Sequence, residues 1–242
     1  MQKFRSTMQG KLYLVPNHLG NENTSITIPT EVATLACRSR FFIVENIRTA
    51  RRYLKLLDRD MNIDASTFFV LDKHTSPKDY ASFLEPAKQG HDICIISEAG
   101  CPGVADPGAE IVKLAHQQNI EVVPFTGPSS IILALMASGL NGQNFAFRGY
   151  LPIDKNERSK AIKQLEAHSL KENQTQLFIE APYRNNAMAN DLLNYCRPNT
   201  LICIACNLTL PDEFVVTRSA SGWKGKLPEL HKKPTMFLIQ GQ

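Results

Sequence analysis

The loop from Ser97 to Gly108, with the sequence SEAGCPGVADPG, carries the residue types best suited to chemistry in this chain. It directly follows the β-branched apolar run 93–96, and a helical pattern begins at its far end. Ligands of open α/β sheets bind just beyond the carboxyl ends of strands, and glycines and prolines give a rigid backbone that a ligand can approach closely. The loop matches neither G-x-G-x-x-G nor G-x-x-x-x-G-K-[ST], so a small molecule other than a dinucleotide or a triphosphate is predicted to bind here.

A second polar pair, Glu45 and Arg48, lies where the apolar run 41–44 gives way to a helical pattern. A spacing of three places two helical side chains on one face. The pair is therefore either functional or a surface ion pair worth about 0.2–0.5 kcal/mol. The loop histidines His18 and His74 are weaker candidates, which we expect to be solvated.

Basic residues form two clusters that are interpreted equally well as RNA-backbone contacts or as solvated surface. The net charge is +4 and the pI is about 8.7, which permits a polyanionic partner without requiring one. No aromatic-rich platform for base stacking is evident in the sequence. The first cluster is a helical stripe of Arg48, Arg51, Arg52, Lys55 and Arg59, and the second consists of Lys224, Lys226, Lys232 and Lys233.

Apolar runs alternate with helical patterns in the first half, which predicts a mostly parallel sheet, whereas consecutive strands near the end predict a mixed sheet. The pattern restarts after Phe125, so two domains are expected, 1–124 and 125–242. Strands are predicted at 12–15, 41–44, 67–71, 93–96, 121–125, 144–152, 176–180, 201–206, 213–219 and 235–239. Helices are predicted at 30–39, 46–59, 77–89, 107–118, 129–138, 155–170 and 185–196.

The composition is that of an ordinary globular protein, with 43% hydrophobic and 21% charged residues in 242. No apolar run approaches the roughly 20 residues that span a bilayer, and the opening stretch Met1–Ser6 lacks the apolar core of a signal peptide. We therefore expect a cytoplasmic protein without membrane contact. Cys203 and Cys206 lie on a predicted strand and point to opposite faces, so neither a metal site nor a redox pair is expected.

Five segments, in order and spacing, resemble the motifs of the tetrapyrrole-methylase family, the class III S-adenosylmethionine methyltransferases. The nearest branch is of the type of the small-subunit ribosomal RNA ribose 2′-O-methyltransferase I. The segments are Pro16–Asn21 (PNHLGN), Glu45–Arg48 (ENIR), Ser97–Gly108, Thr126–Ser130 (TGPSS) and Phe147–Pro152 (FRGYLP).

The resemblance implies an α/β fold of two domains, with S-adenosylmethionine in the cleft between them, and a homodimer. It implies that Glu45 takes or shares the proton of a ribose hydroxyl, that Arg48 holds a phosphate or the carboxylate, and that Asn21 positions the substrate. Glu98 then faces the cofactor or caps a turn, and the serines line the pocket or cap a helix. The implied cofactor-binding residues are Glu98, Gly100, Cys101, Pro102, Ser129, Ser130, Ala181 and Asn207.

The second half departs from the ribosomal branch. Glu180 and Arg184 are kept, but Cys206, Asn207 and Leu210 replace residues that are charged in that branch. We expect the fold and the cofactor to be retained. The predicted function is ribose 2′-O-methylation of small-subunit ribosomal RNA, with methylation of a small molecule or another macromolecule, or non-catalytic S-adenosylmethionine binding, as alternatives.

Overall fold

The structure, a computed structural model, describes residues 9–242, so the opening stretch Met1–Ser6 lies outside the described residues. The chain divides into two compact units, the first ending at Pro128 and the second running from Ser129 to Gln242. The sequence placed the boundary a few residues earlier, after residue 124. In the part of the chain that is described, no helix combines the length and the apolar character needed to cross a membrane.

The first unit contains a five-stranded sheet in the order β3-β2-β4-β1-β5, and every pairing is parallel, as predicted. Each strand is short, and β4 is buried along its whole length because both faces of a parallel sheet are covered. The strands are β1 (Leu12–Val15), β2 (Phe41–Val44), β3 (Thr67–Val70), β4 (Ile93–Ile96) and β5 (Val122–Pro124).

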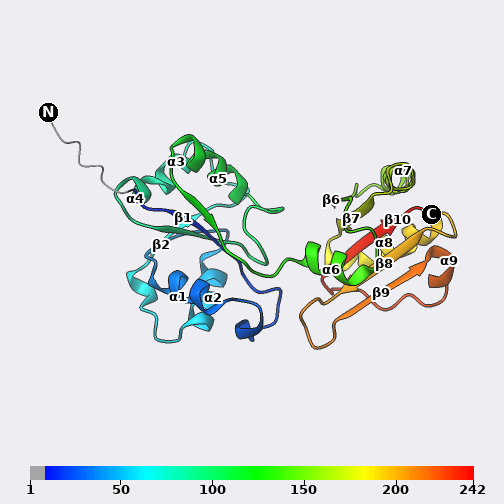
Figure 1. The fold of residues 1–242 in the computed structure, drawn as a ribbon, viewed down its shortest axis with the longest axis horizontal. Coiled ribbons are helices and arrows are strands. Elements are labelled where there is room, and N and C mark those ends of the chain that lie inside the picture. The colour runs from blue at the N-terminus through cyan, green and yellow to red at the C-terminus, as the bar shows by residue number, and fades with distance from the viewer. Residues whose placement is uncertain (1–8) are drawn as a thin grey trace. The chain divides into compact units, whose positions relative to one another are not determined.

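Helices cover both faces of this sheet (Figure 1). On one face, α1 (Thr30–Arg38) and α2 (Ile47–Leu57) pack against strand residues such as Phe42 and Cys94. On the other, α3 (Tyr80–Phe83), α4 (Glu85–Lys88) and α5 (Gly108–Gln117) pack against Ile43 and Ile95. The short 3-10 turns η1 (Thr24–Ile26) and η2 (Ile63–Ala65) complete the unit.

The predicted continuous helix over 77–89 is wrong. The segment forms two four-residue helices, α3 and α4, which meet at Leu84. Pro86 explains the break, because proline has no N–H to donate and its ring clashes with the carbonyl four residues earlier.

The second unit contains a mixed sheet in the order β6-β7-β10-β8-β9. The pair β6–β7 is parallel and the remaining pairs are antiparallel, which confirms the predicted mixed sheet. The strands are β6 (Phe145–Tyr150), β7 (Thr175–Ile179), β8 (Leu201–Cys206), β9 (Phe214–Ser219) and β10 (Thr235–Gln240).

The two faces of the second sheet carry separate cores. Helix α6 (Ser130–Ser138) packs on the face that holds Cys203, whereas Cys206 lies in the core on the other face. The prediction that these two thiols point apart is confirmed, and all six cysteines are free. The second core is formed with α7 (Lys155–Glu172), α8 (Asn185–Tyr195) and α9 (Ala220–Trp223), and α9 was not predicted. A 3-10 turn, η3 (Pro182–Arg184), follows β7.

Candidate functional site

The carboxyl ends of β1, β2 and β4 lie at one edge of the first sheet, because Val15 and Val44 are both in register with Ile96. The chain leaving β1 and the loop leaving β4 are then joined by a two-residue bridge between Asn17 and Gly100. Each backbone N–H of this pair donates to the other's carbonyl, at 2.9 and 3.0 Å. The predicted ligand loop is therefore fixed to the end of β1.

Asn17 is the residue that holds the start of this loop. Its side chain is almost fully buried and donates to the carbonyls of Ser97, at 2.9 Å, and Glu98, at 3.1 Å. Asn17 belongs to the PNHLGN motif, but the sequence did not single it out as a site residue. Its contacts lie about eighty positions away in the chain, and only the fold brings them together.

Gly100 is required by the backbone at this point. Its φ is +71°, and a Cβ there would lie 3.2 Å from the Pro128 carbonyl oxygen and 3.3 Å from the Leu19 side chain. Gly127 is equally confined, since a Cβ would lie 2.1 Å from the ring of Pro16. Two glycines of the resemblance motifs are thus explained by close packing of the chain within the first unit.

The remainder of the loop is closed by Asp106. Its carboxylate accepts the N–H groups of Gly103, at 2.7 Å, and Gly108, at 2.8 Å. Pro102 is buried within this loop, and the half-buried Cys101 thiol donates to the Pro128 carbonyl at 3.5 Å. Burial raises the pKa of the Cys101 thiol, which keeps it protonated at neutral pH.

Glu98 carries an exposed carboxylate that is oriented by a neighbouring helix rather than by its own turn. The Thr49 hydroxyl on α2 donates to the Glu98 carboxylate at 2.5 Å. Glu98 borders a groove of about 360 Å³ that is also lined by Asn17, His18 and Arg52. Thr49 and Arg52 enter the site from α2, and nothing in the local sequence linked Thr49 to Glu98.

Glu45 lies beside two other carboxylates. Partial burial raises its pKa, and the charges of Asp106 and Glu98 raise it further, while a backbone hydrogen bond from Glu98 acts in the opposite direction. Glu45 and Asp106 line the same small cavity at the ends of β2 and β4. A carboxylate with a raised pKa is a stronger base than an ordinary one.

The expectation that Glu45 and Arg48 share a helix face is wrong. Helix α2 begins at Ile47, and Asn46 caps it by accepting the N–H groups of Arg48 and Thr49, at 2.9 and 3.4 Å. Glu45 therefore precedes the helix. Arg48 is exposed, and within residues 9–242 it forms no ion pair with Glu45 or any other acid.

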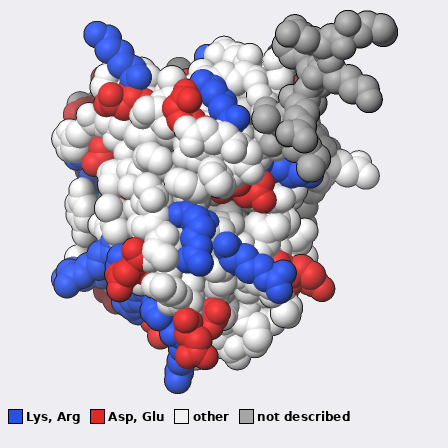
Figure 2. All heavy atoms as spheres, turned by 90° about the vertical axis from the view of Figure 1, so that its left-hand side faces the viewer, with Lys and Arg blue, Asp and Glu red and all other residues white. Residues whose placement is uncertain are grey.

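Most of the basic stripe on α2 is engaged within the unit. Arg51 pairs with Asp64 at 2.5 Å, and Arg52 pairs with Glu22. Lys55 donates to the carbonyls of Arg59 and Met61, at 2.7 and 2.8 Å, and so closes the end of the helix. On the face drawn in Figure 2, basic and acidic side chains are interspersed among uncharged surface. These pairings favour the interpretation of the stripe as structural surface.

His18 is not a solvated loop histidine as expected. Its Nδ1 accepts the Gly20 N–H at 3.0 Å, and its ring lies 5.8 Å from that of Tyr53. Burial lowers the pKa of His18, the charge of Arg52 lowers it further, and Glu22 opposes the change. Asn21 lies nearby and accepts the Asn23 N–H at 2.9 Å, which shapes the turn after Gly20.

The predicted cofactor-binding residues of the second unit lie at the start of α6 and at one edge of the sheet. Ser129 caps α6 by accepting the Ile132 N–H at 3.5 Å, so its predicted capping role is confirmed, and Ser130 is the first helical residue. Ala181 and Asn207 follow β7 and β8, whose residues Ile179 and Ala205 both pair with Met236. Ala181 and Asn207 therefore share one edge of the second sheet. Asn207 has φ +52° and donates to Asp212 at 2.7 Å.

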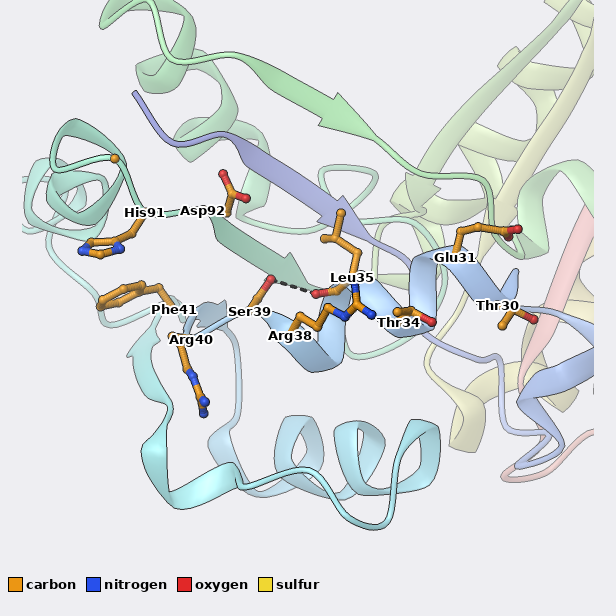
Figure 3. A pocket seen from close by; sticks show the side chains of 11 residues that line it. Thr30, Glu31, Thr34, Leu35, Arg38, Ser39, Arg40, Phe41, His91 and Asp92 are labelled. Atoms are coloured by element: carbon orange, nitrogen blue, oxygen red, sulfur yellow. Dashed lines mark hydrogen bonds between the residues drawn. The ribbon is translucent and has the colours of Figure 1, made fainter. Parts of the chain in front are cut away.

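A larger hollow of about 660 Å³ lies at the opposite edge of the first sheet, at the amino ends of β2 and β4 (Figure 3). Arg38, Phe41 and His91 are among its lining residues, and the rings of Phe41 and His91 lie 5.4 Å apart. None of the predicted site residues lines this hollow.

A family model described as Tetrapyrrole (Corrin/Porphyrin) Methylases matches residues 44–221, which is most of the chain. The chain belongs to this family.

Relatives of known function agree with this assignment. The chain is 30% identical, over 96% of its length and 79% of the relative's, to the Ribosomal RNA small subunit methyltransferase I of Buchnera aphidicola from Acyrthosiphon pisum. It is 29% identical, over 86% of its length and 68% of the relative's, to the protein of that name from Escherichia coli O157:H7.

Two solved structures share the fold at low identity. The methyltransferase CobJ has a TM-score of 0.62 at 18% identity, over 96% of this chain and 94% of the other. Uroporphyrin-III C-methyl transferase from Thermus thermophilus, complexed with S-adenyl homocysteine, has a TM-score of 0.55 at 17% identity, over 96% of this chain and 97% of the other.

As a tetrapyrrole methylase, the protein is an S-adenosylmethionine-dependent methyltransferase. The residues at the edge of the first sheet fit a positively charged methyl donor. Glu45, Glu98 and Asp106 gather there, and in the described chain none of the three is paired with a lysine or arginine. A sulfonium and an ammonium group are stabilised by such carboxylates and by backbone carbonyls.

Proposed function

We propose that this methyltransferase acts on a ribose 2′-hydroxyl of small-subunit ribosomal RNA. The names of the relatives, which match over most of this chain, supply the substrate class. The observation that carries the chemistry is the carboxylate of Glu45, which is held at a sheet edge with a raised pKa.

The three carboxylates at this edge are suited to different tasks. Asp106 accepts two backbone N–H groups, so its role is to hold the loop from Gly103 to Gly108. Glu98 is oriented by the Thr49 hydroxyl, which suits a fixed contact with a bound cation or ligand hydroxyl. Glu45 accepts one backbone N–H, from Glu98, and no side-chain hydrogen bond from the described residues, so in the proposal it is the carboxylate that accepts a proton.

When bound, S-adenosylmethionine supplies an electrophilic methyl group carried on a sulfonium. In the proposal Glu45 accepts the proton of the ribose hydroxyl as the oxygen attacks, and its raised pKa makes that transfer more favourable. Glu98, Gly100, Cys101 and Pro102 line the donor's site, with Asn17 holding their loop in position.

The other predicted residues take supporting roles in the proposal. Arg48 has no acidic partner in the described chain and is available to an RNA phosphate, while Asn21 positions the acceptor. The cofactor-binding residues proposed in the second unit are Ser129, Ser130, Ala181 and Asn207. We further propose a cytoplasmic homodimer, for which sedimentation of the purified protein is the measurement.

A map of ribose methylation on small-subunit RNA, from strains with and without the gene, tests the acceptor. One methylated ribose is expected to disappear on deletion and to return with the wild-type protein. An unchanged map would overturn the RNA acceptor. If calorimetry still recorded S-adenosylmethionine binding, the acceptor would then be sought among small molecules.

The role of Glu45 is tested by complementation with Glu45→Gln, which is expected to leave the ribose unmethylated. Glu31→Gln is the matched control, because Glu31 is an exposed carboxylate that lines the distant hollow. Both variants should be folded, which a cooperative thermal unfolding transition would show. Full methylation by Glu45→Gln would remove Glu45 from the proposed role.

A further inference from the structure

The second unit exposes a group of large apolar side chains at one edge of its sheet. Tyr150, Ile153 and Tyr183, here called the tyrosine surface, are 63%, 70% and 62% exposed. Tyr150 ends β6 in register with Ile179, the last residue of β7, and Tyr183 lies in η3 directly after β7. Residues far apart in the sequence are thus brought to one edge by the parallel pairing of β6 with β7.

Basic groups border the tyrosine surface. The Arg184 guanidinium lies 5.2 Å from the centre of the Tyr183 ring and donates to the Tyr183 hydroxyl at 3.2 Å. Its other contact is an ion pair with the buried Glu180 at 2.6 Å. Lys232 is exposed beside the same turn, since its backbone N–H donates to the Pro182 carbonyl at 3.0 Å.

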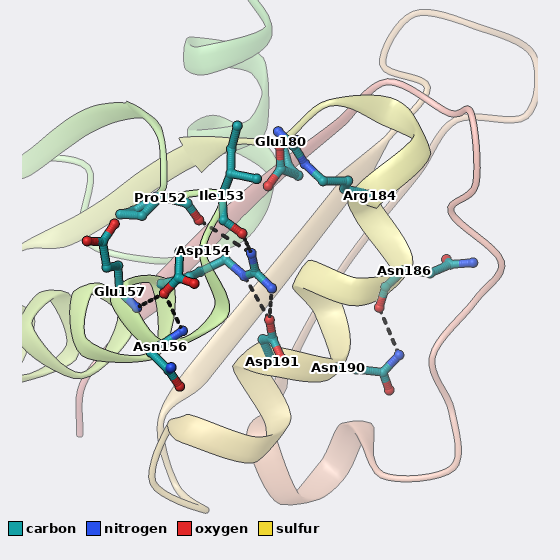
Figure 4. A network of polar contacts seen from close by, with 11 residues as sticks. Pro152, Ile153, Asp154, Asn156, Glu157, Glu180, Arg184, Asn186, Asn190 and Asp191 are labelled. Atoms are coloured by element: carbon teal, nitrogen blue, oxygen red, sulfur yellow. Dashed lines mark hydrogen bonds and ion pairs between the residues drawn. The ribbon is translucent and has the colours of Figure 1, made fainter.

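Two polar networks hold the backbone beneath this surface (Figure 4). The Arg158 guanidinium is buried and donates to the carbonyls of Pro152, at 3.4 Å, and Ile153, at 2.6 Å, while it pairs with Asp191. Glu180 accepts the Ala181 N–H at 2.6 Å in addition to its pair with Arg184. The segments that carry the exposed rings are therefore fixed before any ligand binds, which lowers the entropic cost of binding.

We propose that the tyrosine surface is a stacking platform for unpaired bases of a single RNA strand, with Lys232 serving its phosphates. The inference rests on the proposed RNA acceptor and names the residues that hold it. Exposed aromatic faces beside cations are the arrangement that binds single strands without reading sequence. Two of the acids near this surface have partners, because Glu180 pairs with Arg184 and Asp154 caps α7.

The position of the surface favours the acceptor strand over an unrelated partner. Ala181, a predicted cofactor-binding residue, lies between Glu180 and η3 and is therefore in the same turn as Tyr183. A strand stacked on Tyr183 would be held beside Ala181, which the family resemblance predicts to bind the methyl donor. The platform was not evident in the sequence, because Tyr150 and Tyr183 belong to separate segments.

Fluorescence anisotropy of a labelled twelve-nucleotide oligoadenylate, with the full chain, tests the platform. Tyr150→Ala and Tyr183→Ala are each expected to raise the Kd about tenfold, in the range of one stacked base. Tyr183→Phe keeps the ring and should bind as the wild type does. Phe145→Ala is the matched control, since Phe145 is an exposed ring at the opposite end of β6.

Salt dependence separates stacking from charge. Lys232→Ala is expected to reduce the slope of log Kd against log salt by about one, whereas Tyr183→Ala should leave that slope unchanged. Wild-type affinity in both tyrosine variants would overturn the platform. So would a change from dimer to monomer in those variants without a change in Kd, since the surface would then join two copies of the chain.

The outcome is independent of the methylation map. Loss of oligoadenylate binding in the tyrosine variants, with an unchanged ribose map on gene deletion, would overturn the proposed acceptor and retain the platform. If one ribose methylation were lost on gene deletion and restored by the wild-type gene, while both tyrosine variants bound oligoadenylate with wild-type affinity, the proposed acceptor would be retained and the platform overturned.

Discussion

Replacing Asp191 by alanine is predicted to unfold the second unit at a much lower temperature. Asp191 and Arg158 form an ion pair at 2.6 Å whose side chains are only 8% and 9% exposed. Arg158 also donates to the carbonyls of Pro152 and Ile153, so it cannot leave the interior without releasing that segment. The variant would strand a buried guanidinium whose remaining partners are neutral oxygens.

The expected cost follows from this burial. Breaking a buried ion pair by removing one partner costs about 3–5 kcal/mol, because the other charge stays desolvated. For a domain of this size each kcal/mol lowers the melting temperature by roughly 4 °C. The melting temperature of the second unit is therefore expected to fall by about 12–20 °C. Most of this decrease comes from the desolvated charge of Arg158 rather than from the lost hydrogen bond.

The assay is thermal unfolding followed by circular dichroism, with Glu85→Ala as the matched control. The Lys88–Glu85 pair has the same 2.6 Å separation, but its side chains are 40% and 50% exposed. Water screens such a pair, and its loss costs at most about 1 kcal/mol. The double variant Arg158→Met with Asp191→Leu should recover most of the stability, since no charge is left buried. Equal losses in Asp191→Ala and Glu85→Ala would refute the reasoning.

Three further predictions concern the first unit. Because the folded pKa of Glu45 is raised above its ordinary value of 4.5, its contribution to stability is full below that value and lost as pH rises through the folded pKa. The melting temperature of Glu45→Gln should therefore exceed that of the wild type at pH 7 but not at pH 4. The same difference in melting temperature at both pH values would contradict this. An NMR titration of His18 should have its midpoint below 6.5, and a midpoint above that value would contradict the burial. Gly100→Ala should cost about 1–2 kcal/mol by urea unfolding and weaken S-adenosylmethionine binding by calorimetry, whereas the unconfined Gly142→Ala should do neither.

Local sequence patterns predicted most helices and strands, because a strand that is buried on both faces appears in the sequence as a short run of apolar residues. The strands of the first sheet were found within a residue or so at each end, since each is a short apolar run between helices. The break between α3 and α4 was missed although its cause, Pro86, is local. Helix α9 was missed because four residues give too short a period to recognise.

Contacts between distant segments could not be predicted. The stripe on α2 was visible as spacing, but its acidic partners Asp64 and Glu22 lie outside the helix. Thr49 and Glu98 were likewise brought together only by the pairing of β2 with β4. Motifs therefore indicated which segments form the candidate site, and the tertiary structure determines which side chains in those segments have ion-pair or hydrogen-bond partners.

Two Glu–Arg pairs, each close in sequence, differ in whether the two side chains form an ion pair. Glu180 and Arg184 form an ion pair because the 3-10 turn η3 folds the chain back, and the carboxylate is 1% exposed. Glu45 and Arg48 do not, because Asn46 caps α2 and leaves Glu45 outside the helix. A carboxylate that is paired and buried is committed to structure, whereas one that is half-buried among other carboxylates has a raised pKa and can accept a proton. The cap at Asn46 is thus what keeps Glu45 off the helix and out of an ion pair with Arg48.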